Sequence, residues 1–307
     1  MGTIIGLIII AIGAMCQSSS YVPINRIKDW SWESYWVVQG VFAWLLLPLL
    51  GAMLAVPAGE SLLGLFASVP SFNLWMTVFF GVLWGIGGLT FGLSMRYLGV
   101  ALGQSIALGT CAALGTIMGP VLMNVFFPEL GALESLTFAV VLGVIVTLVG
   151  IAVIGVAGSM KASTLSEEEK KIAVRDFNFP KGLAIALLAG FMSGCFNVGL
   201  EFGKDINFGS LTDPMFRTLP ATLLVTIGGF FTNAVYCFWQ NQRNGTWSDY
   251  GKAEVWKNNL FFCLFNVHTV PPSNGALETA SLLFYYSSNS YFCSTNFIAQ
   301  AGTCGSL

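Results

Sequence analysis

Residues 135–159 read SLTFAVVLGVIVTLVGIAVIGVAGS, with no charged side chain and only serine and threonine as polar ones. An α-helix needs about 20 mostly apolar residues to cross the hydrocarbon core of a bilayer. A run of this length and character is typical of a membrane-spanning helix and not of a buried helix in a soluble domain. We therefore predict that these residues cross a membrane.

Similar segments recur along the chain and make seven predicted spans: 3–24, 34–57, 73–95, 99–127, 135–159, 181–201 and 217–240. We interpret 3–24 as the first span and not as a signal peptide, because no basic residues precede it. The composition agrees, since 55% of the residues are hydrophobic and only 9% are charged, against about 25% charged in a soluble domain. The predicted class is an all-α integral membrane protein, with the lipid bilayer as its main surroundings.

The positive charges predict the orientation. Loops after the first, third, fifth and seventh predicted spans hold eleven Lys and Arg residues, whereas the other loops hold only Lys204 and Arg217. Lys and Arg in short loops stay on the cytoplasmic side. The polar linker 161–180 is therefore predicted to be cytoplasmic and the N-terminus external.

A weak internal repeat divides the chain at that linker. A shift of 176 residues places Gly6-Leu7 on Gly182-Leu183 and Lys28-Asp29 on Lys204-Asp205. Five helices per unit is an odd number, so a second copy would enter the membrane from the opposite side. Such inverted repeats are common in secondary transporters, with the substrate near the midplane. We predict a first repeat over 1–160 and a partial second repeat over 181–264.

The last part of the chain differs in character. Residues 259–264 resemble the beginning of an eighth helix, but the tail 265–307 is rich in Ser, Asn and Thr and has no segment apolar enough to span. We interpret this tail as aberrant, out of register with the original reading frame. A natural polar tail is the alternative.

The sequence lacks the residues that several classes of function require. The seven cysteines form no C-x-x-C pair and His268 is the sole histidine, so we expect no metal site, no cofactor and no enzymatic catalytic set. No phosphate-binding G-x-x-x-x-G-K-[ST] loop is present. The net charge of −2 without a basic patch argues against a nucleic-acid partner.

Two features of the predicted spans bear on packing and function: ridges of glycine and polar side chains. Gly81, Gly85, Gly88 and Gly92, and the series Gly103, Ala107, Cys111, Gly115 and Gly119, predict close helix packing. Amide and ionisable groups within spans are costly in lipid and often functional; these are Gln39, Gln104, Asn124, Asn197, Glu201 and Asn233. Trp30, Trp32 and Trp36 are interpreted as an aromatic belt at the membrane interface.

From these groups we select two candidate sites. A sugar ring can stack on aromatic side chains and bond to amides and hydroxyls, so the candidate substrate site consists of Trp84, Thr90, Phe91, Gln104 and Asn197. The candidate proton-coupling group is Glu201 with Lys204 and Asp205. Burial would favour protonation of Glu201 whereas Lys204 would oppose it. A solvated helix end is the plainer reading of that group.

The strings Trp30-Ser31-Trp32-Glu33 and Met95-Arg96-Tyr97-Leu98-Gly99 carry a resemblance to a known family. With Trp84-Gly85-Ile86-Gly87 and Phe177-Asn178-Phe179-Pro180, they resemble the L-rhamnose–proton symporter family of the drug/metabolite transporter superfamily, over residues 5–263. The resemblance implies inverted five-helix repeats and import of L-rhamnose or a related sugar with protons across a bacterial inner membrane. The alternatives are a superfamily member that exports a metabolite, or a membrane sensor or assembly protein without transport.

Overall fold

The computed structural model describes residues 27–164, 177–212 and 216–265. The predicted first span 3–24, most of the linker and the tail after Phe265 lie outside the described residues. All regular secondary structure in the described part is helical, which confirms the predicted class.

Six helical segments in the described part are long and apolar enough to cross a membrane. The first combines α3 (Trp32–Gly40), the π-helix η1 (Val41–Leu46) and α4 (Leu47–Leu54), and the others are α6 (Ser71–Leu98), α7 (Val100–Phe126), α8 (Phe138–Thr164), α10 (Phe179–Phe202) and α11 (Leu219–Asn244). They confirm the six predicted spans from 34–57 to 217–240, with boundaries that differ by a few residues.

Shorter helices lie between the spans, namely α5 (Leu62–Ser68), η2 (Pro128–Leu130), η3 (Ala132–Ser135) and η4 (Gly209–Leu211). Two more follow α11, namely η5 (Thr246–Gly251) and α12 (Ala253–Phe265). The helix expected to begin at Asn259 is α12, and it begins earlier, at Ala253. Glu254 and Lys257 break the apolar pattern there, but Val255 and Asn259 are buried, so the helix has one buried face.

The ends of the long helices follow from particular residues. Asn178 accepts a hydrogen bond from the backbone N–H of Lys181 at 3.1 Å and caps α10, with Pro180 in the first turn. Gly99 alone separates α6 from α7 and has φ 80°, a conformation that L side chains rarely adopt. Gly245, with φ 69°, ends α11.

Glycines bring the central helices together. A Cβ on Gly87 of α6 would lie 2.6 Å from the backbone nitrogen of Ser193 on α10, and one on Gly81 would collide with the Val225 carbonyl of α11. On α7, a Cβ on Gly115 would lie 2.6 Å from Nδ2 of Asn197. These contacts confirm Gly81 and Gly115 as packing positions and add Gly87, which the predicted ridge did not include.

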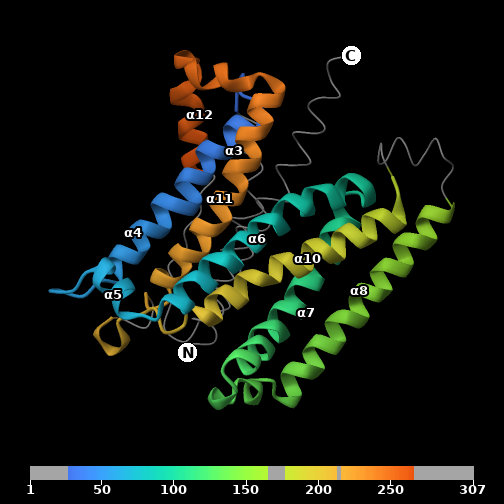
Figure 1. Cartoon of the computed structure of the whole chain (residues 1–307). Helices are drawn as coiled ribbons and strands as arrows, with labels where there is room; N and C mark the ends of the chain where they lie inside the picture. Colours follow the sequence, from blue (N-terminus) through green and yellow to red (C-terminus); the bar gives the residue numbers. More distant parts are fainter. Residues whose placement is uncertain (1–26, 165–176, 213–215, 266–307) are drawn as a thin grey trace, which may run out of the picture.

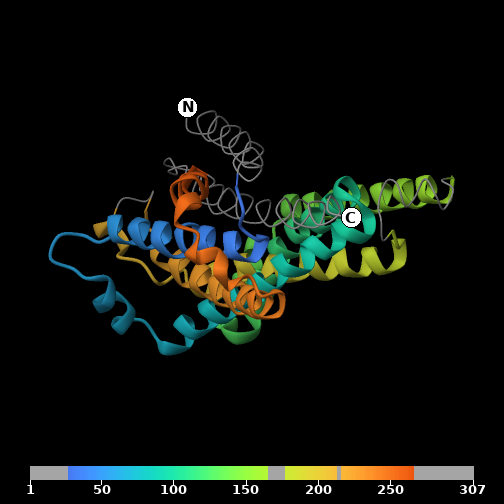
Figure 2. The ribbon, with the colours of Figure 1, turned by 90° about the horizontal axis from the view of Figure 1, so that it is seen from above.

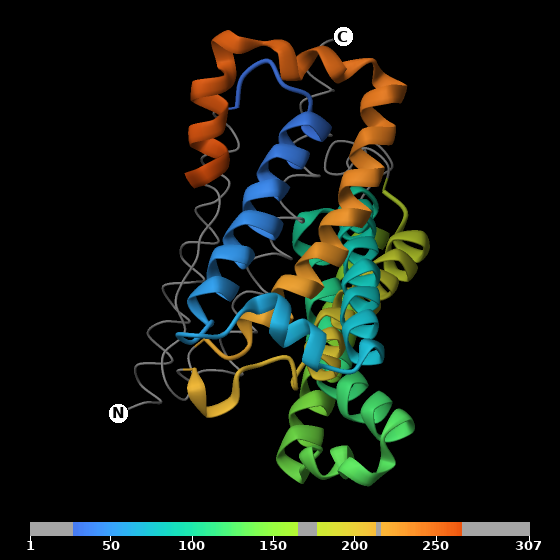
Figure 3. The same ribbon diagram turned by 60° about the vertical axis from the view of Figure 1, so that its left-hand side comes forward.

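The arrangement places α10 at the centre, packed on α6 and α7, while α11 packs on α6, α3 and α4 (Figure 1). Seen from above, α8 lies at one end of an elongated molecule and α4 and α5 lie at the other (Figure 2). Figure 3 shows α12 standing beside the beginning of α3, joined to α11 by η5. Helices from the two sides of the linker are therefore in direct contact.

Candidate functional site

A column of aromatic rings crosses the interior from α3 to α10. The ring centroids of Trp36 and Trp44 are 5.4 Å apart, those of Trp44 and Trp84 are 6.1 Å apart, and those of Trp84 and Phe196 are 5.0 Å apart. All three pairs meet edge to face, a preferred geometry for aromatic rings. The four side chains are at most 4% exposed, so the column is part of the protein interior.

The π-helix η1 positions Trp44 in this column. In a regular α-helix, residues eight apart are offset by about 80° around the axis, which would turn Trp44 away from Trp36. The wider π-turn, in which Leu47 N–H donates to Phe42 O, reduces that offset. Such π-bulges often occur at functional sites.

Gln39 occupies the last turn of α3, directly before η1 and one turn after Trp36. Its side chain is fully buried, and within the described residues neither Oε1 nor Nε2 has a hydrogen-bond partner. A buried group left unpaired costs about 1–3 kcal/mol. The Oγ of Ser193 on α10 and the Oγ1 of Thr110 on α7 are also buried and find no partner in the described part of the chain. Gln39 is thus an available donor and acceptor beside the column.

The residues selected from the sequence for sugar binding lie in different environments. Trp84 lies in the column and Phe91 is fully buried in the same hydrophobic core. Thr90 donates to the Gly87 carbonyl of its own helix at 2.9 Å. Asn197 lies over Gly115 on α7, and the side chain of Gln104 lies outside the described residues.

Glu201 lies at the end of α10, with 38% of its side chain exposed and Nζ of Lys204 3.6 Å from its Oε1. Its Cγ would lie 3.4 Å from a Cβ on Gly119, so the aliphatic part packs on α7 and the carboxylate faces outward. Asp205 is exposed beyond the helix.

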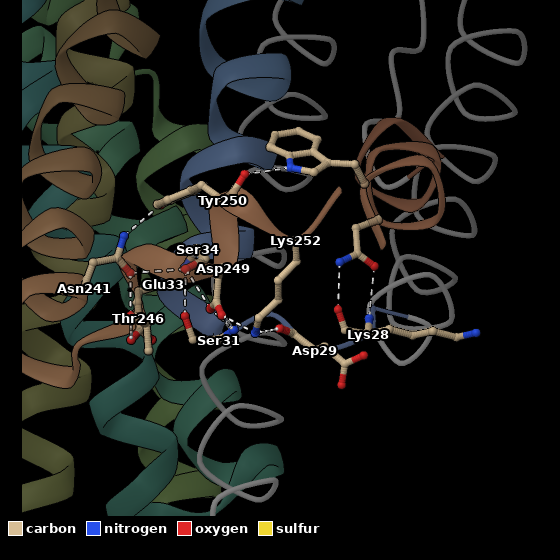
Figure 4. Close-up of polar contacts among 12 residues, drawn as sticks. Lys28, Asp29, Ser31, Glu33, Ser34, Asn241, Thr246, Asp249, Tyr250 and Lys252 are labelled. Atoms are coloured by element: carbon tan, nitrogen blue, oxygen red, sulfur yellow. Dashed lines mark hydrogen bonds and ion pairs between the residues drawn. The ribbon is translucent and has the colours of Figure 1, made fainter. Parts of the chain in front are cut away.

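A second polar cluster, which we call the Asp249 network, lies where η5 meets the beginning of α3 (Figure 4). Asp249 of η5 accepts hydrogen bonds from the Ser31 N–H at 2.7 Å and the Ser34 hydroxyl at 3.0 Å, and Lys252 Nζ lies 2.6 Å from its other oxygen. Burial raises the pKa of Asp249, but the hydrogen bonds from Lys252, Ser31 and Ser34 outweigh it and hold the pKa below its ordinary value. The carboxylate is therefore ionised and bonded on both oxygens.

Glu33 belongs to the same cluster and is only 6% exposed. Its Oε1 accepts from Nδ2 of Asn244 and from the hydroxyl of Thr246, both at 2.9 Å. Asn241 connects the two acids, because its Oδ1 accepts from Ser34 and Thr246. The cluster ties the beginning of α3 to the end of α11.

The neighbouring helix α12 is held by backbone recognition. Asn259 accepts from the Lys28 N–H at 3.0 Å and donates to the Lys28 carbonyl at 2.8 Å. Trp256 donates to the Tyr250 carbonyl, and its ring meets Trp30 edge to face at 4.9 Å. The start of α12 is therefore docked on the segment before α3.

The interpretation of Trp36 as an interfacial residue is wrong, because its side chain is 0% exposed and its Nε1 donates to Asn233. Trp32 stacks on Trp36 at 5.5 Å. Sequence reasoning also missed Glu33 and Asp249, which look like ordinary charges at a helix start and in a turn. Within the described residues no group of three or more His, Cys, Asp and Glu is placed to hold a metal ion.

Comparison with known proteins assigns the family. Residues 1–255 match the family of the L-rhamnose-proton symport protein (RhaT). The L-rhamnose-proton symporter of Cronobacter sakazakii is 34% identical over 230 residues, covering 74% of this chain and 64% of the relative. That of Yersinia pestis bv. Antiqua is 32% identical over 238 residues, covering 76% and 66%.

The chain thus spans just under two thirds of the length of these curated relatives. No solved structure matches it. The match over residues 1–255 agrees with the resemblance carried by the W-S-W-E and M-R-Y-L-G strings. The chain therefore belongs to the L-rhamnose-proton symport protein (RhaT) family, a family of transporters and not of enzymes.

Proposed function

We propose that this protein imports L-rhamnose or a related deoxy sugar together with protons across a bacterial inner membrane. The family match over residues 1–255 carries this proposal. The six apolar spans and the relatives named L-rhamnose-proton symporter support it. The clustering of Lys and Arg supports a cytoplasmic linker at 161–180 and a periplasmic N-terminus.

The interior chemistry suits a neutral sugar. Sugars present C–H faces that pack on aromatic rings and hydroxyls that need hydrogen bonds, and small-molecule sites combine apolar walls with a few polar groups. Trp84 and Phe91 provide aromatic surface on α6, and Asn197 provides an amide on α10. We keep Thr90 and Gln104 as further candidate contacts within this proposal.

For the proton we propose Glu201, with Lys204 and Asp205 as its charged neighbours. We propose that the two repeats, 1–160 and 181–264, rock against each other along the contacts of α10 with α6 and α7. The close contacts at Gly87 and Gly115 leave α10 little room to tilt away from α6 and α7. In the proposed motion α10 would therefore slide along α6 and α7 while staying packed on them.

Uptake in cells without their own L-rhamnose transporter tests the proposal. Cells that express the chain should accumulate radiolabelled L-rhamnose, and a protonophore should abolish the accumulation. Cells with the empty vector, and labelled D-glucose in place of L-rhamnose, are the controls. Absence of both uptake and exchange, with the protein folded in the membrane, would contradict the proposal, as would net efflux against a gradient.

A further inference from the structure

We propose that Gln39 is the hydrogen-bonding anchor of a neutral monosaccharide that binds against the Trp36, Trp44 and Trp84 rings. The inference rests on the proposed function and assigns its substrate to a particular side chain. Gln39 was among the amides noted in the sequence, but nothing in the sequence distinguished it from the others.

The contrast with other buried amides singles it out. Asn233 accepts from Trp36 and donates to the Gly229 carbonyl. Asn241 accepts from Ser34 and donates to Tyr250, and Asn259 uses both of its amide atoms on Lys28. Gln39 is as buried as these residues, yet neither of its amide atoms has a partner among residues 27–164, 177–212 and 216–265. Buried polar groups in proteins are nearly always paired, so an exception of this kind requires an explanation.

The position of Gln39 supplies that explanation. It follows Trp36 by one turn and stands two residues before Val41, where the π-helix begins that brings Trp44 toward Trp36 and Trp84. A Cβ on the next residue, Gly40, would lie 3.0 Å from the Trp44 ring, so the tryptophan packs against the backbone at this level. The unpaired amide, Trp36 and Trp44 therefore lie within nine residues of one another on one span, and Trp84 of α6 packs on Trp44.

The chemistry points to a neutral polyol. A glutamine amide donates from Nε2 and accepts at Oε1, which matches two adjacent hydroxyls of a sugar, one used as acceptor and one as donor. The aromatic rings match its apolar C–H face. The helix α3 has no Lys or Arg that could bind an anion. Its one carboxylate, Glu33, is already bonded by Asn244 and Thr246, so a cation would find no free counterion on this helix either.

Gln39→Met is the central test, since methionine keeps the unbranched shape and removes both polar atoms. Binding of L-rhamnose to the detergent-solubilised full chain is measured by calorimetry, and stability by thermal unfolding. We expect binding at least about tenfold weaker, since two hydrogen bonds are lost. We also expect a higher Tm, because an unpaired buried amide is removed. A structural glutamine would give the opposite shift in Tm.

Two additions keep the test decisive. Gln240→Met is the control: it makes the same change on α11, two turns beyond Asn233, and should leave binding unchanged. If Gln39→Met does not fold, Gln39→Leu replaces it as the test variant. On the wild-type chain, L-rhamnose analogues that each lack one ring hydroxyl provide a test without mutation. At least one analogue should bind several-fold weaker to the wild type and lose no further affinity in Gln39→Met.

The outcomes separate this inference from the proposed function. If the wild type binds L-rhamnose and both Gln39 variants bind it equally well, the inference is overturned while the function stands. If the wild type binds L-fucose, D-xylose or D-glucose but not L-rhamnose, and Gln39→Met abolishes that binding, the anchor is right and the proposed sugar is wrong. Failure of the wild type to bind any of these sugars overturns both.

Discussion

The indole Nε1 of Trp36 on α3 donates a hydrogen bond to Oδ1 of Asn233 on α11 across 3.2 Å. Both side chains are buried, and the bond joins the first described span to the last one. It also fixes the first ring of the aromatic column, next to Gln39. This pair therefore contributes both to the packing of α3 on α11 and to the geometry of the candidate site, alongside the contacts of Ser34 and Glu33 with α11.

Replacing Trp36 by phenylalanine should destabilise the protein by about 1–3 kcal/mol, because Asn233 would keep a buried oxygen without a donor. Denaturant or thermal unfolding in detergent measures the loss. Trp75→Phe is the matched control, since Trp75 is 73% exposed on α6. Equal stability of the two variants would show that the Trp36–Asn233 bond contributes nothing.

Gly81→Ala should be strongly destabilising, by at least about 1–3 kcal/mol. The added methyl would meet the backbone carbonyl of Val225, which cannot rotate away as a side chain can. Gly143→Ala on α8 is the control: a Cβ there meets nothing within 4 Å, and alanine favours the helix by about 1 kcal/mol over glycine. Thermal unfolding should separate the two variants, and similar Tm values would contradict the contact between α6 and α11.

Asp249→Asn should destabilise the protein by about 1–3 kcal/mol at pH 7, the range for hydrogen bonds to a charged group. The folded pKa of Asp249 is lowered, so its contribution is fully present above the ordinary carboxyl pKa of about 3.9. It is lost as the pH falls from there through the folded pKa.

The difference between wild type and Asp249→Asn should therefore be constant from pH 7 to about 5 and should shrink below about pH 4. Unfolding measured across this range checks it. Glu134→Gln, a change at an exposed acid in η3, should show no comparable difference at pH 7. A gap that widens toward acid pH would reverse the assigned sign.

Glu201→Gln should abolish proton-driven accumulation of the sugar and leave energy-independent exchange intact, because the amide keeps the shape and cannot titrate. Uptake with an imposed pH gradient, compared with counterflow without one, makes the measurement. Glu129→Gln on the neighbouring η2 is the control. If Glu201→Gln still accumulates sugar, the buried Glu33 becomes the next acid to test.

Ser248→Cys and Ser210→Cys test the orientation on a background without the seven native cysteines. Both positions are exposed, in η5 and η4 respectively, at opposite ends of α11. An impermeant thiol reagent added outside intact cells should label Ser210→Cys only. Labelling of Ser248→Cys from outside would invert the topology and remove the charge argument for a periplasmic N-terminus.

The spans could be predicted because the lipid environment constrains the sequence of each span separately. Every stretch of about 20 residues in the hydrocarbon must be apolar and must satisfy its own backbone, so Phe138 to Gly158 identifies α8 without reference to any other helix. Gly81 and Gly115 were likewise identifiable, since small residues at helical spacing allow close approach whichever helix is the partner. The inverted repeat and the boundaries of the two halves stay predictions.

The amino-acid sequence by itself determined the membrane class, the spans, the glycine ridges and, through W-S-W-E and M-R-Y-L-G, the family. Only the tertiary structure decided which polar groups are paired. Gln39, Asn233 and Asn241 are all amides within spans, and local pattern treats them alike. Pairing depends on atoms more than a hundred residues away, such as Trp36 for Asn233 and Ser34 for Asn241. Hydrogen bonds act over about 3 Å in space, so only the packed helices reveal that Gln39 has no partner in the part of the chain that the structure describes.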